Sequence, residues 1–205
     1  LLPGEAVTKE DMGVLLIYPP ASRPCEAPAG LARLAGALKR HGIHVTCVDA
    51  NYEGILRLLV DPPAGRDTWT RRAATHLTRN LAALRGWASY TNIDRYARAV
   101  ADINRILSQA AAPLGGTLTL ANYQDDSLSP LRSEDLIRAA HLPEGNVFFP
   151  YFRQRLADIM EEEAPALVGF SLNYLSQALS TFAMIGCVRR LSPTVRILLG
   201  GGLVT

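Results

Sequence analysis

Two stretches of this chain share one pattern, in which a short apolar run, an amphipathic helical segment and a second apolar run follow one another. The first stretch covers residues 13–52 and the second covers residues 164–205. Apolar, β-branched runs of this length are typical of strands that are buried on both faces of a parallel sheet. A strand, a helix and a parallel strand make a βαβ unit. We therefore expect an α/β protein with a Rossmann- or flavodoxin-like parallel sheet.

The periodicity of the apolar residues sets the bounds of the expected elements. The expected strands lie at residues 14–18, 44–49, 167–172 and 195–199. One helix is expected from about Leu31 to Gly42, where a glycine can adopt the left-handed conformation that ends a helix. The other is expected over residues 176–191. The last strand runs into three glycines just before Thr205, so we expect a sheet that is truncated at its C-terminal end.

A large insertion, residues 53–163, separates the second expected strand from the third. It is much longer than an ordinary connection between elements of one domain. Its pattern is mostly helical, with helices expected at residues 68–85, 93–111, 133–140 and 151–163 and a short strand at 117–121. Trp69 and Trp87 bracket the first of these helices and are expected to anchor the core of the insertion.

Composition and charge argue against several classes of function. The 205-residue chain has 21 basic and 19 acidic side chains, a net charge of 21 − 19 = +2, so no strong field favours nucleic acid or a membrane surface. No apolar run approaches the roughly 20 residues that a membrane-spanning helix needs. No signal peptide is evident, and cysteines at positions 25, 47 and 187 suit a reducing compartment. We expect a cytoplasmic protein with neither nucleic acid nor membrane as partner.

The loop after the first strand, YPPASRPCEAPAG, contains Pro19, Pro20, Pro24 and Pro28. A dinucleotide fold binds pyrophosphate with exposed backbone N–H groups in a glycine-rich turn, and proline has no N–H group. The loop therefore disfavours a nucleotide-dependent oxidoreductase or transferase, although Asp49 ends the second strand, where a ribose-binding acid would lie. A stiff, apolar loop at the carboxyl end of a strand suits a large, mostly apolar ligand or a partner domain.

Four segments, in their order along the chain, resemble the N-terminal cobalamin-binding domain of radical S-adenosylmethionine enzymes. These are VLLIYPP, EAPAGLARLAGALKRHGIHVTCVDAN, PALVGFSLNYLSQ and VRILLGGGLVT. The resemblance covers residues 13–52 and 164–205 and leaves the insertion unexplained. It implies a cobalamin-binding module. The [4Fe–4S] cluster and the S-adenosylmethionine site would belong to a C-terminal radical domain beyond Thr205, which would be the partner of this module.

The resemblance also implies which residues bind the cofactor. Ser171 would hydrogen-bond the buried nucleotide tail, and Gly200 and Gly201 would let the backbone pass close to it. The leucine of the family's Ser-x-Leu turn is displaced, because Leu172 directly follows the serine. Asn173 and Tyr174 follow at the carboxyl end of the same strand, where they either contact a ligand or cap the next helix. The expected cofactor-binding residues are Pro20, Glu26, Gly30, Ser171, Leu172, Asn173, Tyr174, Gly200, Gly201 and Gly202.

The histidine that ligates cobalt in many cobalamin carriers has no counterpart in the proline-rich loop. Cobalamin would therefore bind without a histidine ligand, and we expect neither a metal site nor a catalytic residue in this chain. Cys25 is expected to be a partly buried loop thiol rather than a cobalt ligand. The alternative is a degenerate, non-binding docking or regulatory domain of the same fold, in which the insertion fills or caps the groove. An exposed last strand would allow two copies to pair as a homodimer.

Overall fold

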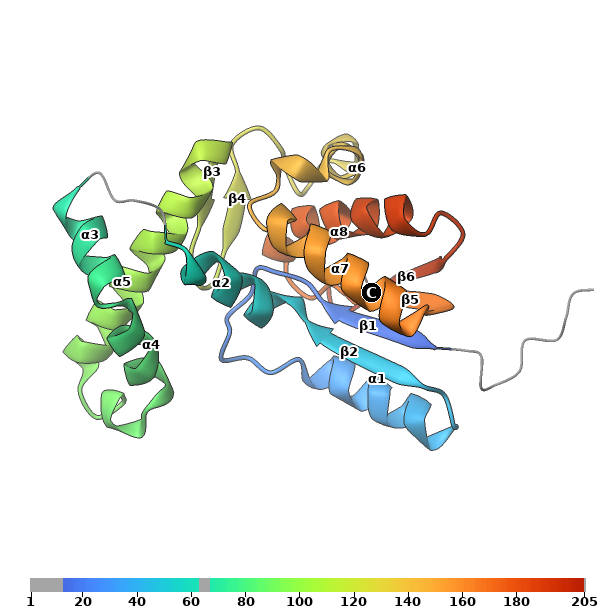
Figure 1. The fold of residues 1–205 in the computed structure, drawn as a ribbon, viewed down its shortest axis with the longest axis horizontal. Coiled ribbons are helices and arrows are strands. Elements are labelled where there is room, and N and C mark those ends of the chain that lie inside the picture. Colours follow the sequence, from blue (N-terminus) through green and yellow to red (C-terminus); the bar gives the residue numbers. More distant parts are fainter. Residues whose placement is uncertain (1–12, 63–66, 205) are drawn as a thin grey trace, which may run out of the picture.

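The structure is a computed structural model that describes residues 13–62 and 67–204. Four parallel strands form its central sheet in the order β2–β1–β5–β6 (Figure 1). These strands are β1 (Val14–Tyr18), β2 (Val45–Asp49), β5 (Leu167–Ser171) and β6 (Arg196–Gly200). All four expected strands are present within one residue of their predicted bounds. The strand order is the one with which a flavodoxin-like sheet begins, so the expected α/β fold is confirmed.

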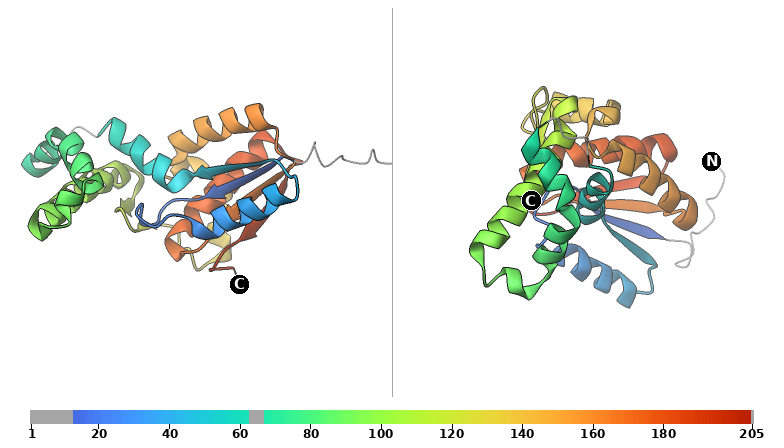
Figure 2. Two further views of the ribbon diagram at one scale, coloured as in Figure 1. Left: turned by 90° about the horizontal axis from the view of Figure 1, so that it is seen from below. Right: turned by 60° about the vertical axis from the view of Figure 1, so that its left-hand side comes forward.

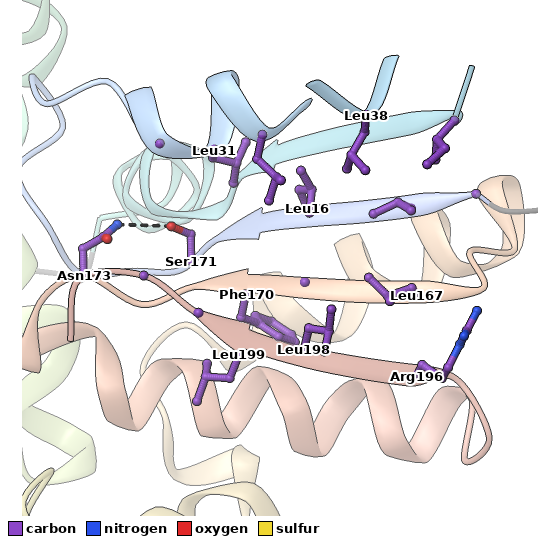
Figure 3. Close-up of a pocket in the computed structure, with 18 of the residues that line it drawn as sticks. Leu16, Leu31, Leu38, Leu167, Phe170, Ser171, Asn173, Arg196, Leu198 and Leu199 are labelled. Atoms are coloured by element: carbon purple, nitrogen blue, oxygen red, sulfur yellow. Dashed lines mark hydrogen bonds between the residues drawn. The ribbon is translucent and has the colours of Figure 1, made fainter. Parts of the chain in front are cut away.

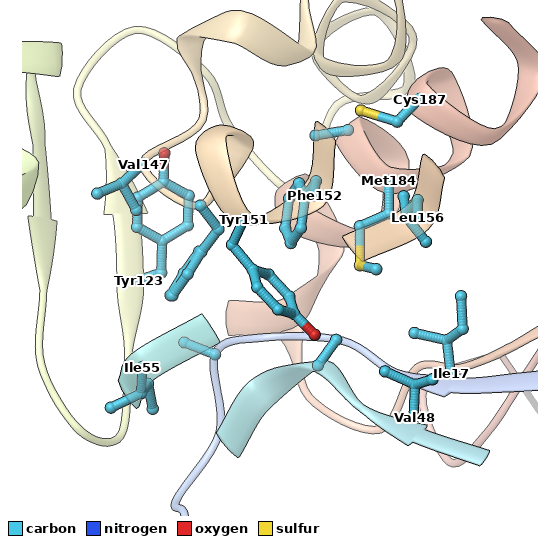
Figure 4. Close-up of a cluster of buried hydrophobic side chains, with 14 of the residues drawn as sticks. Ile17, Val48, Ile55, Tyr123, Val147, Tyr151, Phe152, Leu156, Met184 and Cys187 are labelled. Carbon is cyan, nitrogen blue, oxygen red and sulfur yellow. The ribbon is translucent and has the colours of Figure 1, made fainter. Parts of the chain in front are cut away.

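One face of the sheet is covered by three helices. They are α2 (Ala50–Val60), α7 (Phe149–Glu163) and α8 (Ala178–Leu191). Leu15, Ile17 and Phe170 point from the strands into this layer and are buried. They pack against aromatic and aliphatic side chains of the helices, among them Tyr151, Phe152, Leu156 and Met184 (Figure 4). Most of α2 and all of α7 lie in the expected insertion, yet both helices belong to the core that covers the sheet.

The opposite face carries one helix, α1 (Ala29–Arg40), which lies on the other side of the sheet from α7 and α8 (Figure 1). A smaller buried cluster joins it to β1 and β2, and consists of Leu16, Tyr18, Leu31, Ala35 and Val45. Gly42 has φ +73°, as expected for the end of this helix. No helix of the described chain covers β5 and β6 on this face, and the side chain of Leu198 in β6 is 59% exposed.

Most of the rest of the insertion lies beyond the carboxyl ends of the strands, whereas its helix α6 (Ser133–His141) packs against α8 (Figures 1 and 2). Its helices are α3 (Thr68–Thr75), α4 (Leu77–Arg85), α5 (Ile93–Ala111) and α6 (Ser133–His141), with a hairpin of β3 (Gly116–Leu118) and β4 (Tyr123–Asp125). Tyr123 of the hairpin meets Phe148 edge-on, with ring centroids 6.2 Å apart. The edge-on ring contact ties the hairpin to the segment that leads into α7.

Several local expectations differ from the structure. A helix, α2, directly follows β2 because the Asp49 carboxylate accepts the N–H of Tyr52 at 2.9 Å and caps it. Asp49 is therefore the N-cap residue of α2. The single helix expected over residues 68–85 is wrong, since it divides into α3 and α4 at His76. The short strand expected at 117–121 is present in part and pairs with β4, which has no counterpart among the expected elements.

The two tryptophans lie differently from expectation. The Trp69 indole N–H donates to the buried Asp102 carboxylate at 3.0 Å, but about half of its side chain is exposed. Trp87 is 82% exposed, so its prediction as a core anchor is wrong. Among the residues that the structure describes, no helix combines the length and apolarity required to cross a membrane.

Candidate functional site

A groove of about 760 Å³ lies on the half-covered face of the sheet, between α1 and the strands β1, β5 and β6 (Figure 3). Its surface is mostly apolar, and seven leucines line it: Leu16, Leu31, Leu34, Leu38, Leu167, Leu198 and Leu199. Among its described lining residues, Arg196 is the one with a charged side chain, and it lies at the amino end of β6. The groove is therefore suited to an apolar guest rather than to a phosphate-rich one.

Gly169 shapes the floor of the groove. It lies in the middle of β5, opposite Leu16 of β1 and Leu198 of β6. A Cβ atom at this position would come within 2.9 Å of the Leu16 Cδ2 atom. Because Gly169 has no side chain, Leu16 can lie flat against β5, and no side chain projects into the groove from this position.

The carboxyl end of the groove is built largely from backbone. Gly201 has φ +113°, and a Cβ atom there would overlap the carbonyl group of Leu172, so this turn requires glycine. Gly30 and Gly200 differ, because no heavy atom lies within 4 Å of the position of an added Cβ. At these two positions the absent side chain leaves open space for a guest.

Two polar side chains, Ser171 and Asn173, lie at the carboxyl end of the groove. The Asn173 Nδ2 group donates to the Ser171 hydroxyl oxygen at 3.2 Å, and Asn173 Oδ1 accepts the N–H of Gly202 at 2.9 Å. Asn173 therefore joins the end of β5 to the turn after β6 rather than capping the next helix. Because Ser171 accepts this bond, its own hydroxyl hydrogen is available to a ligand in the groove.

Gln177, which is fully buried, holds the loops at this end of the sheet in place. Its Nε2 group donates to the Pro19 carbonyl at 2.6 Å. Its Oε1 atom accepts the N–H groups of Asn173 and Tyr174 at 2.9 and 3.1 Å. One side chain thus fixes the proline-rich loop relative to the β5 loop. Gln177 is not among the expected site residues: its place between the apolar positions 175 and 179 indicates burial, but no local pattern points to its partner Pro19.

Glu26 and Tyr174 form the exposed rim beside the groove. The Tyr174 hydroxyl donates to the Glu26 carboxylate at 2.7 Å, which raises the pKa of Tyr174. Arg23 lies on the other oxygen of Glu26, at 3.4 Å. The rim pair thus links the proline-rich loop to the β5 loop a second time, at the surface.

The ten residues expected to bind the cofactor fall into three groups. Six of them line the groove, and these are Gly30, Ser171, Asn173, Gly200, Gly201 and Gly202. Glu26 and Tyr174 lie at the rim, bonded to each other. Pro20 and Leu172 are buried and do not line the groove. The structure therefore brings together the glycines and the serine, and places the two apolar residues behind them.

The groove offers no evident ligand for a metal ion. None of its described lining residues is a histidine or a cysteine. Residues 13–62 and 67–204 contain no group of three or more His, Cys, Asp or Glu side chains arranged to hold a metal ion. Cys25 is exposed, contrary to the expected partly buried thiol, and it lines a separate cavity between α2 and α5.

The insertion leaves the groove free. Every described lining residue comes from residues 13–43 or 166–202, so the helices and the hairpin of the insertion contribute no part of its wall. The groove is therefore formed by the two terminal segments that share the βαβ pattern. Comparisons of this chain with protein-family models, with curated proteins and with solved structures find no match.

Proposed function

We propose that this chain is the cobalamin-binding module of a radical S-adenosylmethionine enzyme. One observation carries the proposal: an apolar groove runs from the sheet face to Ser171 and Gly200–Gly202, and the insertion does not fill it. Ligands of open α/β sheets bind at the carboxyl ends of the strands, where this groove ends. The alternative docking role, with the groove filled or capped by the insertion, lacks this support.

The nucleotide tail of cobalamin would lie along the groove between α1 and the floor at Gly169. The Ser171 hydroxyl would donate a hydrogen bond to it, and Gly200 would allow close approach of the backbone. The corrin ring would rest at the carboxyl edge, beside the proline-rich loop that Gln177 holds in place. When bound, cobalamin would supply methyl transfer or carbon-skeleton rearrangement, with no histidine of this chain on the cobalt.

The radical step would belong to a partner domain that carries the [4Fe–4S] cluster and binds S-adenosylmethionine. The three cysteines of this chain are not arranged for a cluster, since Cys25 and Cys47 are exposed and Cys187 is buried in the core. All three are free thiols, which supports the proposed cytoplasmic location.

The test is a titration of the purified chain with hydroxocobalamin, followed by the visible spectrum of the cofactor. We expect saturable binding with a dissociation constant on the order of micromolar. In Gly200→Leu, a side chain enters the groove at a position with no heavy atom within 4 Å, and binding is expected to weaken at least about tenfold. Gly201 is unsuitable for this test, because any side chain there strains the backbone.

The matched control is Gly36→Leu, which adds the same side chain at an exposed glycine of α1 outside the groove. Circular dichroism melts establish that both variants are folded. Absence of binding to the folded wild-type chain contradicts the proposal and favours the docking or regulatory role. Equal weakening in the two variants contradicts the groove as the site.

A further inference from the structure

Positive charge is concentrated in the helices α3 to α5 of the insertion. Residues 68–111 contain seven arginines, two aspartates and neither lysine nor glutamate, a net charge of 7 − 2 = +5. The whole chain carries +2, so the remainder carries 2 − 5 = −3. The near-neutral total therefore conceals one basic segment.

Three of these arginines line one cavity of about 440 Å³ between α4 and α5. Arg79 comes from α4, and Arg95 and Arg98 come from α5, where a spacing of three places them on one side of the helix. Buried alanines, Ala83 and Ala99, leave the space between the helices open. Asp94 is the one carboxylate among the described lining residues, so the cavity carries 3 − 1 = +2.

Three of the four other arginines of these helices have side-chain partners, and the exposed Arg71 is the exception, whereas none of the cavity arginines has one among the described residues. Arg105 pairs with Asp67 at 2.8 Å, Arg72 lies 3.6 Å from Asp102, and Arg85 donates to the Tyr52 hydroxyl at 2.9 Å. Within the described chain, the side chains of the three cavity arginines form no ion pair and no hydrogen bond. Like charges gathered around one concave space repel each other, and an anion between them would relieve that repulsion.

The walls of this cavity are held in place by a buried carboxylate. Asp102 of α5 accepts the indole N–H of Trp69 at 3.0 Å and the Nδ2 group of Asn80 at 3.1 Å. These two bonds join α3 and α4 to α5. Asn92 accepts the N–H of Arg95 at 3.0 Å, so this first-turn N–H is already used and the guanidinium groups are the donors left for a ligand.

We propose that the cavity binds a small ligand that bears a phosphate chain, through Arg79, Arg95 and Arg98. The planar guanidinium fork matches pairs of phosphate oxygens, and three such groups suit a diphosphate or triphosphate better than a single carboxylate. The charge lies within a concave space rather than along an extended surface, which favours a small ligand over a nucleic acid. The site is separate from the sheet groove and does not depend on the proposed cobalamin role.

The test is isothermal titration calorimetry of the full chain with tripolyphosphate, with pyrophosphate and inorganic phosphate as shorter probes, at constant ionic strength. We expect one saturable site that binds tripolyphosphate more tightly than pyrophosphate and inorganic phosphate, and whose affinity falls with added salt. Arg95→Gln and Arg98→Gln are each expected to weaken tripolyphosphate binding about tenfold. Both side chains are exposed, so the variants should melt like the wild type.

The control is Arg71→Gln, which removes an exposed arginine of α3 that does not line the cavity. Arg71→Gln should bind tripolyphosphate as tightly as the wild type does. Gly200→Leu, in the sheet groove, should also leave the affinity for tripolyphosphate unchanged. No saturable heat with any phosphate probe overturns the proposal. Equal weakening by Arg71→Gln also overturns the proposal, because it would indicate diffuse charge. Tighter binding of an oligonucleotide or an acidic peptide than of tripolyphosphate overturns it as well.

Discussion

Both faces of the central sheet carry apolar residues, but α2, α7 and α8 cover one face, whereas α1 covers only part of the other. On one face, Phe170 is buried under α7 and α8. On the other, its neighbour Gly169 lies on the floor of a groove, and Leu198 beside it is largely exposed. Neighbouring residues of a strand point to opposite faces, so one apolar strand can supply both a core and a site. Whether an apolar strand face becomes core or site depends on which helices cover it.

The last strand shows the same contrast within five residues. In β6, Ile197 and Leu199 are partly buried against the covered face, whereas Arg196, Leu198 and Gly200 are exposed on the other. Its sequence, RILLG, does not alternate in polarity as a strand with one exposed face normally does. Leu198 is therefore an apolar side chain on the open face, where a ligand of the proposed kind would contact it.

The largest expected difference between the faces comes from a pair of leucine truncations. Leu15→Ala removes a fully buried side chain on the covered face and should lower the free energy of unfolding by about 2–5 kcal/mol. Leu198→Ala on the open face should change it by no more than about 0.5 kcal/mol, because water already reaches that side chain. Urea denaturation of both variants measures the two values. Similar losses in both would mean that the open face is covered in solution.

Replacing each of two helix glycines by alanine should change the free energy of unfolding in opposite directions. Gly186 of α8 lies against α6, where an added Cβ would overlap the carbonyl group of Ala140, so Gly186→Ala should destabilise by about 1–3 kcal/mol. Gly36 of α1 has open space around it, and Gly36→Ala should stabilise by about 0.5–1 kcal/mol. Thermal melts of the two variants provide the comparison. A stable Gly186→Ala protein would show that α6 is not packed tightly on α8.

The smallest expected effect on stability concerns the thiol of Cys187. Burial raises the pKa of Cys187, in the covered core, to about 11 from the ordinary value of 9.0. The folded state then keeps a proton that the unfolded chain loses, so this stabilisation is complete below pH 9 and is lost as the pH rises from 9 towards 11. Unfolding free energies measured across this range should fall less steeply in Cys187→Ala than in the wild type.

Thiol labelling measures the same contrast between the faces. Cys47 of β2 and Cys25 are exposed and should react with a thiol reagent in the native protein. Cys187 should react only after denaturant is added. The control is Cys187→Ala, in which denaturant should add no further reactive thiol. Three thiols reacting at one rate in the native wild type would contradict the burial of Cys187.

Much of the fold follows from local pattern. Strands β1, β5 and β6 each contain a short apolar run, and α5 begins and ends at the predicted residues because Asn92 caps it and a proline follows closely. Helix α2 was missed because its amphipathic pattern begins inside what reads as a turn, at Asn51 and Tyr52. β4 was missed because three residues carry too little periodicity to indicate a strand.

The candidate site was predictable in part. Ser171 ends β5 and Gly200 ends β6, and the carboxyl ends of parallel strands lie at one edge of a sheet. The role of Gln177 was not predictable, because its partner Pro19 is 158 positions away. The exposure of Trp87 was also unexpected, since a large aromatic side chain in a helical segment is more often buried.

The sequence by itself determined the parallel sheet, the helices that alternate with its end strands and the stiff, donor-poor character of the proline-rich loop. These properties depend on residue type and short-range spacing, which act through local backbone preferences. Tertiary structure alone decided that α1 covers only part of one face, that the groove beside it stays open, and that three arginines from two helices surround one cavity. Each of these depends on contacts between segments far apart in the chain, and no local pattern encodes which of them meet.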